Sequence, residues 1–206
     1  MSVENIITKT KCPFARGAKI EKVTINSRNL PTAIKNLREP ILEFFTKKAK
    51  NGYDALTFIF EDHNFGNSIE KLTINTKKFY VALATEFPEL QIPIEIDDYN
   101  QVSWPEIACE KFFMVSFAPC YSKDSSRYNH EDPRTFFFLQ PASSFERHAH
   151  DGNAVTDEFR EKIRKLFAKS GQPYDSEISS LQNEWVKLVH PLKLGDEIIK
   201  WWEVKE

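Results

Sequence analysis

The chain has 206 residues, of which 41% are hydrophobic and 17 are Phe, enough apolar material for the core of one domain. Its 28 basic and 30 acidic residues give a net charge of −2 and are spread along the chain, so we expect no nucleic-acid partner. The apolar runs are far shorter than the ~20 residues that span a bilayer, and the start lacks the order of a secretory signal. We therefore expect one domain, residues 1–206, in the cytoplasm and without a membrane partner.

Common chemical signatures are missing from the sequence. Cys12, Cys109 and Cys120 form no Cys-x-x-Cys pair and cannot close a disulfide framework, which predicts reduced thiols. The six glycines form neither a dinucleotide fingerprint nor a phosphate-binding loop, and the zinc-protease and serine-esterase motifs are absent. Chemistry has to be sought in less standard segments.

The first elements are predicted as follows. An irregular N-terminal arm of about residues 1–18 precedes a short strand at 19–25, where apolar and polar residues alternate. Pro31 and Pro40 each suit the first turn of a short helix, so we expect one broken helix that stops at Asn51-Gly52. Residues 54–61 are a short apolar run with polar neighbours, which favours a buried strand.

The middle of the chain continues with a helix that Pro88 ends, because four large side chains recur at helical spacing: Phe79, Tyr80, Leu83 and Phe87. Residues 111–117 and 135–140 are nearly continuous aromatic runs, typical of central strands that are covered on both faces. We expect these two runs and residues 54–61 to be neighbours in one sheet with helices on both faces. The polar residues between the two runs are predicted to form a loop.

Two more helices are expected in the last third. The first extends from a cap at Thr156 to Gly171, with four apolar residues at helical spacing: Phe159, Ile163, Leu166 and Phe167. The second repeats that spacing up to Pro191, with Leu181, Trp185, Leu188 and Val189. The tail, about residues 191–206, holds Trp201-Trp202, whose rings bury either within the chain or across a homodimer interface. Strands and helices are interspersed, so the fold class is α/β or α+β, with a mixed central β-sheet flanked by helices.

The segment from Lys11 to Ala18 (KCPFARGA) is the first candidate site. The cations of Lys11 and Arg16 can lower the pKa of the Cys12 thiol, and a Cys-Pro turn can present a thiolate to a haem iron. The alternative is a small buried thiol that only packs.

Two further candidate segments follow the predicted central strands. One carries Cys120 and leads to Arg127, and the other carries Ser143 and Ser144, one of which can cap a short helix, and then Glu146, Arg147 and His148. Arg127 and Arg147 are suited to bind a carboxylate or haem propionates as bidentate donors, and we predict that they face the same cavity. Solvated surface charges are the simpler interpretation, and the same holds for the closely spaced His148 and His150.

Several of these segments, in this order, resemble the YqcI/YcgG-type bacterial family. The resemblance covers most of the chain and rests on these residues and ranges: Cys12-Pro13-Phe14-Ala15, 56–60, 112–117 with Pro119, Ser126-Arg127, Phe138-Leu139-Gln140-Pro141, Phe145-Glu146, Ile163-Arg164 and Glu184-Trp185. The chain departs from the family pattern where Ala118, Tyr121 and Ala142 stand, since related chains often carry histidine at such positions.

The resemblance implies a haem-dependent oxygenase that hydroxylates nitrogen on a small amino or guanidino compound, using haem b, dioxygen and an external electron donor. It implies Cys12 as the axial metal ligand, with Cys120 and His148 as the next choices.

Arg16 and Arg147 are then expected to help bind the cofactor. Arg127 and Glu146 are the expected catalytic residues, with the Glu146 carboxylate holding the substrate's amine or guanidinium. Two alternatives stay open: a noncatalytic haem or small-molecule binding or sensor protein, and a cofactor-free acyl- or amine-processing enzyme.

Overall fold

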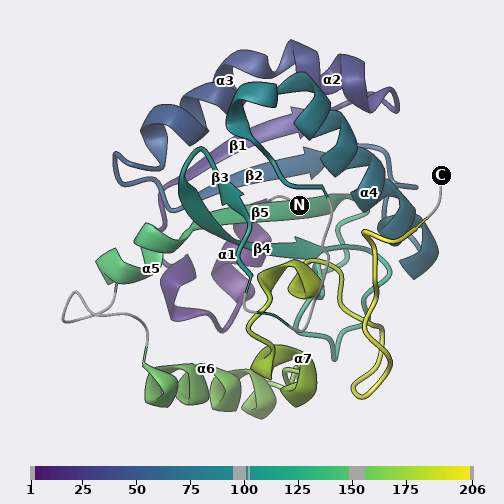
Figure 1. The fold of residues 1–206 in the computed structure, drawn as a ribbon. Coiled ribbons are helices and arrows are strands. Elements are labelled where there is room, and N and C mark those ends of the chain that lie inside the picture. Colours follow the sequence, from purple (N-terminus) through teal and green to yellow (C-terminus); the bar gives the residue numbers. More distant parts are fainter. Residues whose placement is uncertain (1–2, 95–100, 102, 149–155, 205–206) are drawn as a thin grey trace.

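A five-stranded mixed sheet forms the centre of the computed structural model, which describes residues 3–94, 101, 103–148 and 156–204 (Figure 1). The strands lie in the order β1-β2-β5-β4-β3, with these bounds: β1 Ile20–Ile25, β2 Ala55–Phe60, β3 Glu106–Ile107, β4 Glu110–Phe117 and β5 Thr135–Pro141. β1 and β2 are parallel, and each of the other neighbouring pairs is antiparallel. The predicted mixed sheet is therefore confirmed, and the chain is an α+β domain.

The parallel β1–β2 pair needs a crossover, and the predicted broken helix supplies it. The crossover consists of α2 (Leu30–Asn36), α3 (Arg38–Glu43) and the π-helix η2 (Phe44–Lys48). Asn29 caps α2 by accepting a hydrogen bond from the Thr32 amide, and Leu37 separates the two helices.

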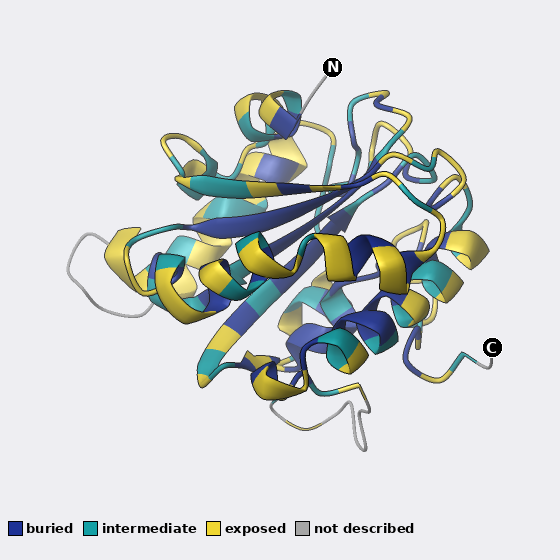
Figure 2. Cartoon of the chain, turned by 90° about the horizontal axis from the view of Figure 1, so that it is seen from above, coloured by how far each residue is buried: buried dark blue, intermediate teal, exposed yellow. Residues whose placement is uncertain are grey.

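The three aromatic runs are neighbours in the sheet, as expected. Phe58 of β2 pairs with Phe137 of β5, and β5 pairs on its other side with β4, which contains Phe113. Helices lie on both faces of these strands, with α2, α3 and α4 (Ile69–Glu86) on one side and α1 (Val3–Lys9), α5 (Ala142–His148) and α6 (Asp157–Lys169) on the other (Figure 1). The central strands are buried over most of their length, whereas the outer helix turns are exposed (Figure 2).

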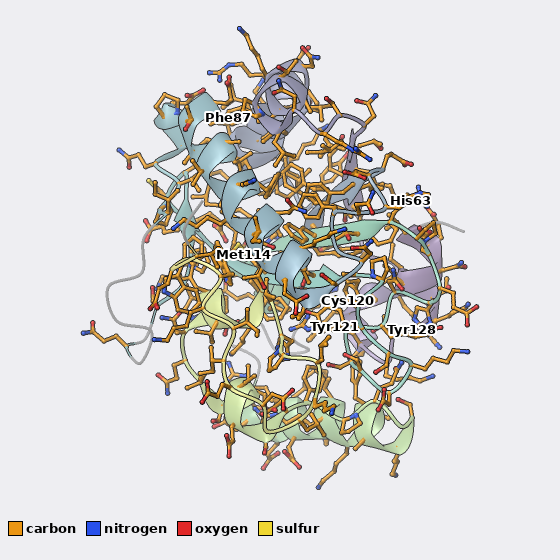
Figure 3. The ribbon with its side chains drawn as sticks, turned by 90° about the vertical axis from the view of Figure 1, so that its right-hand side faces the viewer. His63, Phe87, Met114, Cys120, Tyr121 and Tyr128 are labelled. Atoms are coloured by element: carbon orange, nitrogen blue, oxygen red, sulfur yellow. The ribbon has the colours of Figure 1, made fainter. Side chains whose placement is uncertain are left out.

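The larger core cluster lies between the sheet and α4. Phe79 of α4 contacts the rings of Phe58, Phe60 and Phe137 at centroid distances of 4.9–5.6 Å. Tyr80, next to Phe79, donates a hydrogen bond to the Met114 sulfur at 2.6 Å, on β4 below the helix (Figure 3). This layer anchors α4 and continues into the C-terminal segment.

The smaller core cluster on the opposite face corrects one expectation. Val3 and Ile6 of α1 pack against Ile59, Val115 and other apolar residues of the central strands. The N-terminal arm is therefore an ordered helix followed by the short 3-10 helix η1 (Pro13–Ala15), and the prediction of an irregular arm was wrong.

The C-terminal third contains one confirmed helix and one that was wrongly predicted. α6 begins after Thr156, whose side chain accepts a hydrogen bond from the Phe159 amide, as predicted. Residues 181–189 do not form a continuous helix: the short helix α7 (Ser176–Ser180) ends before them, and within them only the 3-10 helix η4 (Glu184–Lys187) forms. The reason is that Ser103 exchanges backbone hydrogen bonds with Gln182 and Glu184, which holds this stretch extended.

The tryptophan pair packs within the chain. Trp201 is 1% exposed and Trp202 is 4% exposed. Trp201 donates its indole hydrogen bond to the Trp185 carbonyl, and its ring lies 5.2 Å from that of Tyr80. Among the described residues, no helix is long and apolar enough to cross a membrane.

Candidate functional site

Cys12 lies half-buried at the start of η1, beside a cluster of aromatic rings. The Phe14 ring contacts Phe145 of α5 at 5.6 Å and Phe159 of α6 at 5.4 Å, and Phe145 in turn contacts Phe113 of β4. Burial raises the pKa of the Cys12 thiol above its ordinary value, although backbone hydrogen bonds partly oppose this effect. Without a bound group the side chain is therefore a neutral thiol at neutral pH.

The cations expected to activate Cys12 do not do so. Lys11 and Arg16 are exposed, and within the described part of the chain neither contributes to the pKa of Cys12. The sequence argument for a cation-stabilised thiolate was therefore wrong, because both cations point into solvent.

Cys120 follows the end of β4, where its backbone amide donates to the Gly66 carbonyl at 3.0 Å. Burial raises the pKa of its thiol to about 12, and the charge of Glu70 acts in the same direction. Tyr121 is the next residue (Figure 3) and is fully engaged with His190: its hydroxyl donates to the His190 carbonyl and accepts from the His190 amide, both at 3.0 Å.

The residues after β5 converge on Asp54, which directly precedes β2. The Asp54 Oδ1 accepts hydrogen bonds from Ser144 Oγ at 2.9 Å and Arg147 Nη2 at 3.1 Å, and it lies 2.9 Å from His148 Nε2. Its Oδ2 accepts from the Lys19 amide at 2.8 Å. These bonds lower the pKa of the carboxyl group even though burial alone would raise it. Ser144 thus holds α5 against the sheet, and its hydroxyl does not cap that helix.

Glu146 is exposed on α5, and no hydrogen bond or ion pair joins it to another described residue. The structure brings it together with no other predicted site residue. His150, the second histidine of the predicted pair, lies outside the described residues.

Arg127 is the most deeply buried of the predicted site residues, with 4% of its surface exposed. Its Nη2 donates to the Lys187 carbonyl at 3.2 Å and lies 3.2 Å from Nε2 of His190, which is 6% exposed. Arginine is only a donor, so His190 Nε2 has to be the unprotonated acceptor and the ring proton sits on Nδ1. Burial, with the positive charges of Arg127 and Lys187, holds the pKa of His190 well below its ordinary value. The imidazole is therefore neutral at neutral pH.

Arg127 and Arg147 do not face one cavity. Each arginine follows the carboxyl end of its strand, β4 or β5, and these two strands are antiparallel, so the arginines lie at opposite ends of the sheet. Arg147 contacts the Tyr53 carbonyl and Asp54. The expectation of a shared cavity was wrong, because it would hold only for parallel strands.

A pocket of about 520 Å³ opens at the carboxyl end of β4, in front of His190. Three segments form its wall: the loop after β4, the turn between α6 and α7, and the start of the C-terminal tail. Its lining residues are Ser122, Asp124, Ser125, Ser126, Gly171, Pro173, Asp175, His190, Pro191, Leu192, Lys193 and Leu194. The Ser125 hydroxyl also accepts a hydrogen bond from the Arg127 amide, so the buried arginine lies directly behind this wall.

The pocket carries both signs of charge at its rim. The Ser122 hydroxyl bonds to Asp124 and lowers the pKa of this exposed carboxyl, which is therefore ionised at neutral pH. The Lys193 ammonium has no partner among the residues that the structure describes. Asp175 is buried and already occupied, since it accepts from the amides of Ile178 and Gly195. Asp124 and Lys193 are thus the charges available to a ligand.

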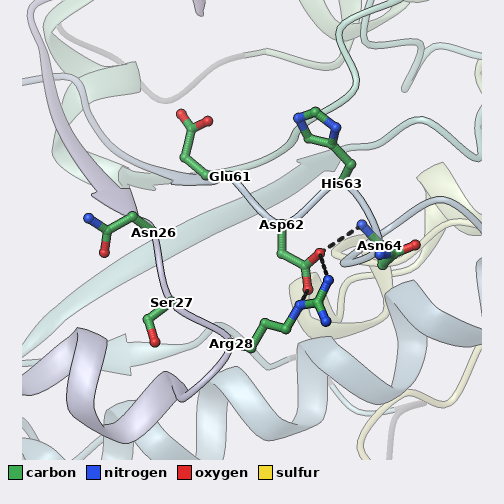
Figure 4. Close-up of a pocket in the computed structure, with 7 residues that line it drawn as sticks. All are labelled: Asn26, Ser27, Arg28, Glu61, Asp62, His63 and Asn64. Atoms are coloured by element: carbon green, nitrogen blue, oxygen red, sulfur yellow. Dashed lines mark hydrogen bonds and ion pairs between the residues drawn. The ribbon is translucent and has the colours of Figure 1, made fainter.

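A second, shallower hollow of about 360 Å³ lies at the carboxyl ends of the parallel strands β1 and β2 (Figure 4). Its charges are paired, because Arg28 bonds to Asp62 and Glu61 bonds to Arg134. The His63 ring lies apart from this Arg28–Asp62 pair (Figure 4). This hollow therefore offers a ligand less unused charge than the pocket at His190.

The key pocket residues were missed in the sequence. His190 gives only one local sign, a polar residue that ends an apolar run and precedes Pro191, and Asp124 and Lys193 look like ordinary solvated charges. Only the fold brings these three residues together. In the described ranges, no group of three or more His, Cys, Asp or Glu side chains is arranged to hold a metal ion.

The fold and the pocket define the class of the chain as an α+β domain with a cavity of mixed polar and apolar lining beside its central sheet. Comparison with models of known families, with curated proteins and with solved structures found no match. The resemblance to the YqcI/YcgG-type family therefore rests on the quoted sequence segments alone.

Proposed function

We propose that the chain binds a small amino or guanidino compound in the pocket in front of His190. The observation that carries this proposal is an ionised carboxylate, Asp124, facing the same cavity as neutral His190 and several serines. A carboxylate accepts hydrogen bonds from an ammonium or guanidinium group more strongly than from a neutral donor. Leu192 and Leu194 supply apolar wall for the carbon chain of such a ligand.

The proposal is tested by isothermal titration of the full chain with L-arginine, agmatine, L-lysine and cadaverine. We expect at least one of these compounds to bind, and Asp124→Asn to weaken its binding about two- to fivefold, the range typical of an exposed ion pair. Glu158→Gln is the matched control, because Glu158 is also an exposed carboxylate but lies on α6 outside the pocket. The proposal is contradicted if none of the four compounds binds the wild type, or if the wild type, Asp124→Asn and Glu158→Gln bind them with equal affinity.

We propose as a second function the haem-dependent N-hydroxylation that the family resemblance implies. The observation in its favour is that Tyr174, which stands between the pocket residues Pro173 and Asp175 in the chain, lies within electrostatic reach of both Cys12 and Arg127. Burial raises the pKa of Tyr174 to about 12, so the phenol stays neutral.

The residues around Cys12 fit a haem in part. Cys12 is half-buried two residues before Phe14, whose ring packs with Phe145 and Phe159, and such apolar surroundings suit a macrocycle. The Nε of buried Arg127 lacks a partner among the described residues. Cys12 would hold the iron and Arg127 a propionate. The cofactor would supply dioxygen activation with electrons from an external donor. Because the thiol is neutral in the protein alone, the metal would have to deprotonate Cys12.

A visible spectrum tests the second function. After addition of haem to the purified chain, a Soret band is expected, and Cys12→Ser should shift or remove it while Cys109→Ser, at an exposed thiol, leaves it unchanged. Substrate-dependent consumption of oxygen and reductant separates an oxygenase from a noncatalytic haem sensor. A chain that gives no Soret band contradicts both haem functions and leaves the binding proposal intact.

We also propose a cytoplasmic location, which the three unpaired cysteines support.

A further inference from the structure

Arg127 is a buried cation that forms no ion pair with a carboxylate among the described residues. Glu184 is the carboxylate that favours its charged form, but Glu184 is bound to Lys187, with 2.7 Å between Oε1 and Nζ. The carboxylate that acts on Arg127 is therefore already in ion-pair contact with Lys187. A buried charge is stable only when it is paired.

The hydrogen bonds of Arg127 are incomplete in the same place. Its Nε is buried and has no partner among the described residues, and the same holds for Oε2 of Glu184. Nη2 is shared between the Lys187 carbonyl and His190 Nε2. The imidazole is a neutral acceptor, so it satisfies a hydrogen bond of the guanidinium but not its charge.

Residues that line the pocket contact this arginine. His190 lines the pocket and contacts Arg127, and Ser125 and Ser126, which precede Arg127, line it as well. A carboxylate that takes the place of the imidazole would accept from both Nη2 and Nε, which is the bidentate geometry that guanidinium favours. It would also give the guanidinium an ion pair of its own.

We infer that Arg127 is the anchor for a carboxylate group of the ligand, which would take the position that the His190 imidazole has in the structure. The inference rests on the proposed binding function and specifies its substrate class. The ligand carries a carboxylate at the Arg127 end of the pocket and a cationic group at the Asp124 end. Lys193 at the rim is the alternative anchor.

The decisive comparison uses pairs of probes that differ in the carboxylate: L-arginine with agmatine, and L-lysine with cadaverine. Binding by the full-length chain should be at least about tenfold tighter for the amino acid of each pair. Arg127→Lys keeps the positive charge but loses the two parallel N–H groups that bind a carboxylate. It should reduce the affinity ratio within each pair to less than about threefold. Arg147→Lys, at the opposite end of the sheet, is the matched control and should leave this ratio unchanged. Lys193→Met tests the alternative anchor and should also leave the ratio unchanged.

A second measurement removes the risk that Arg127→Lys does not fold. In the wild-type chain labelled with ¹⁵N in its arginines, the Nε–H resonance of Arg127 should shift when L-arginine without label is added, and should shift far less with agmatine. Equal affinity for both members of each pair, or an unshifted Nε–H signal, overturns the anchor while the binding function stands. If the affinity ratio within each pair falls to about one in Lys193→Met, the anchor is Lys193 and not Arg127. Failure of all four probes to bind refutes the proposed function itself.

Discussion

Asp54→Asn is the substitution that most directly tests how α5 is held to the sheet. The side chain of Asp54 is 8% exposed, and its two oxygens accept from a backbone amide, a serine, an arginine and a histidine. Asparagine keeps one oxygen but replaces the other with an NH₂ donor. In either orientation of the amide, at least one of the present donors then faces another donor.

The expected loss follows from these bonds. Hydrogen bonds to a charged acceptor contribute about 1.5–3 kcal/mol, and a buried donor without a partner costs about 1–3 kcal/mol. Because Arg147 and His148 are partly exposed and can turn to water, we expect a net loss of about 3 kcal/mol in the free energy of unfolding. For a chain of this length that corresponds to a fall of roughly 6–12 °C in Tm.

Urea denaturation of the wild type and of Asp54→Asn measures this loss. Asp62→Asn is the control, since Asp62 pairs with a largely exposed arginine and its loss should cost less than about 1 kcal/mol. The pKa of Asp54 is lowered in the folded chain, so its stabilising effect is present above the unfolded-state value of about 3.9 and fades as the pH falls through the folded value. The difference between wild type and Asp54→Asn should therefore shrink below about pH 4. A loss under about 1 kcal/mol at pH 7, or a difference that does not change with pH, would refute this account of Asp54.

Three further predictions concern packing and thiol reactivity. Trp201→Ala removes a fully buried ring and should lower the free energy of unfolding by about 3–5 kcal/mol. The Tm should not depend on protein concentration, because the ring packs within the chain. A Tm that does depend on concentration would show that the ring lies in an interface. Gly66→Ala places a Cβ against the Thr135 hydroxyl and 3.0 Å from the Ala118 Cβ. The substitution should therefore destabilise the fold by about 1–3 kcal/mol, measured by thermal unfolding. An unchanged Tm would show that the Thr135 side chain can move away without cost. When the chain is treated with iodoacetamide at pH 8, exposed Cys109 should react first. Cys120 should react last, because the pKa of its thiol is about 12. Mass spectrometry measures the order, and the reverse order would contradict the burial of Cys120.

The central strands could be predicted from the sequence because their signal is local. Three short aromatic runs bounded by polar residues favour buried strands over other structures. Thr156 marks the start of α6, because its hydroxyl is a common N-cap acceptor. The two errors in helices have non-local causes. α1 is only 7 residues long and is stabilised by packing on the sheet. Gln182 and Glu184 are held by backbone hydrogen bonds to Ser103, about 80 positions earlier.

The candidate site was less predictable, because it depends on strand direction. Arg127 was singled out as a candidate binding residue that follows a strand, and it does lie in the loop after β4. Its partner was sought in Arg147, which an antiparallel neighbour carries to the other end of the sheet. The actual neighbour, His190, comes from the C-terminal segment through contacts that no local pattern encodes. Whether Cys12 binds a haem iron stays a prediction.

The most direct test of the central claim is a crystal structure of the chain grown with L-arginine. The account predicts the ligand in the pocket in front of His190, with its guanidinium within hydrogen-bond distance of Asp124 and its carboxylate directed toward Arg127. A pocket without ligand, in crystals that hold L-arginine at another site of the protein, would contradict it.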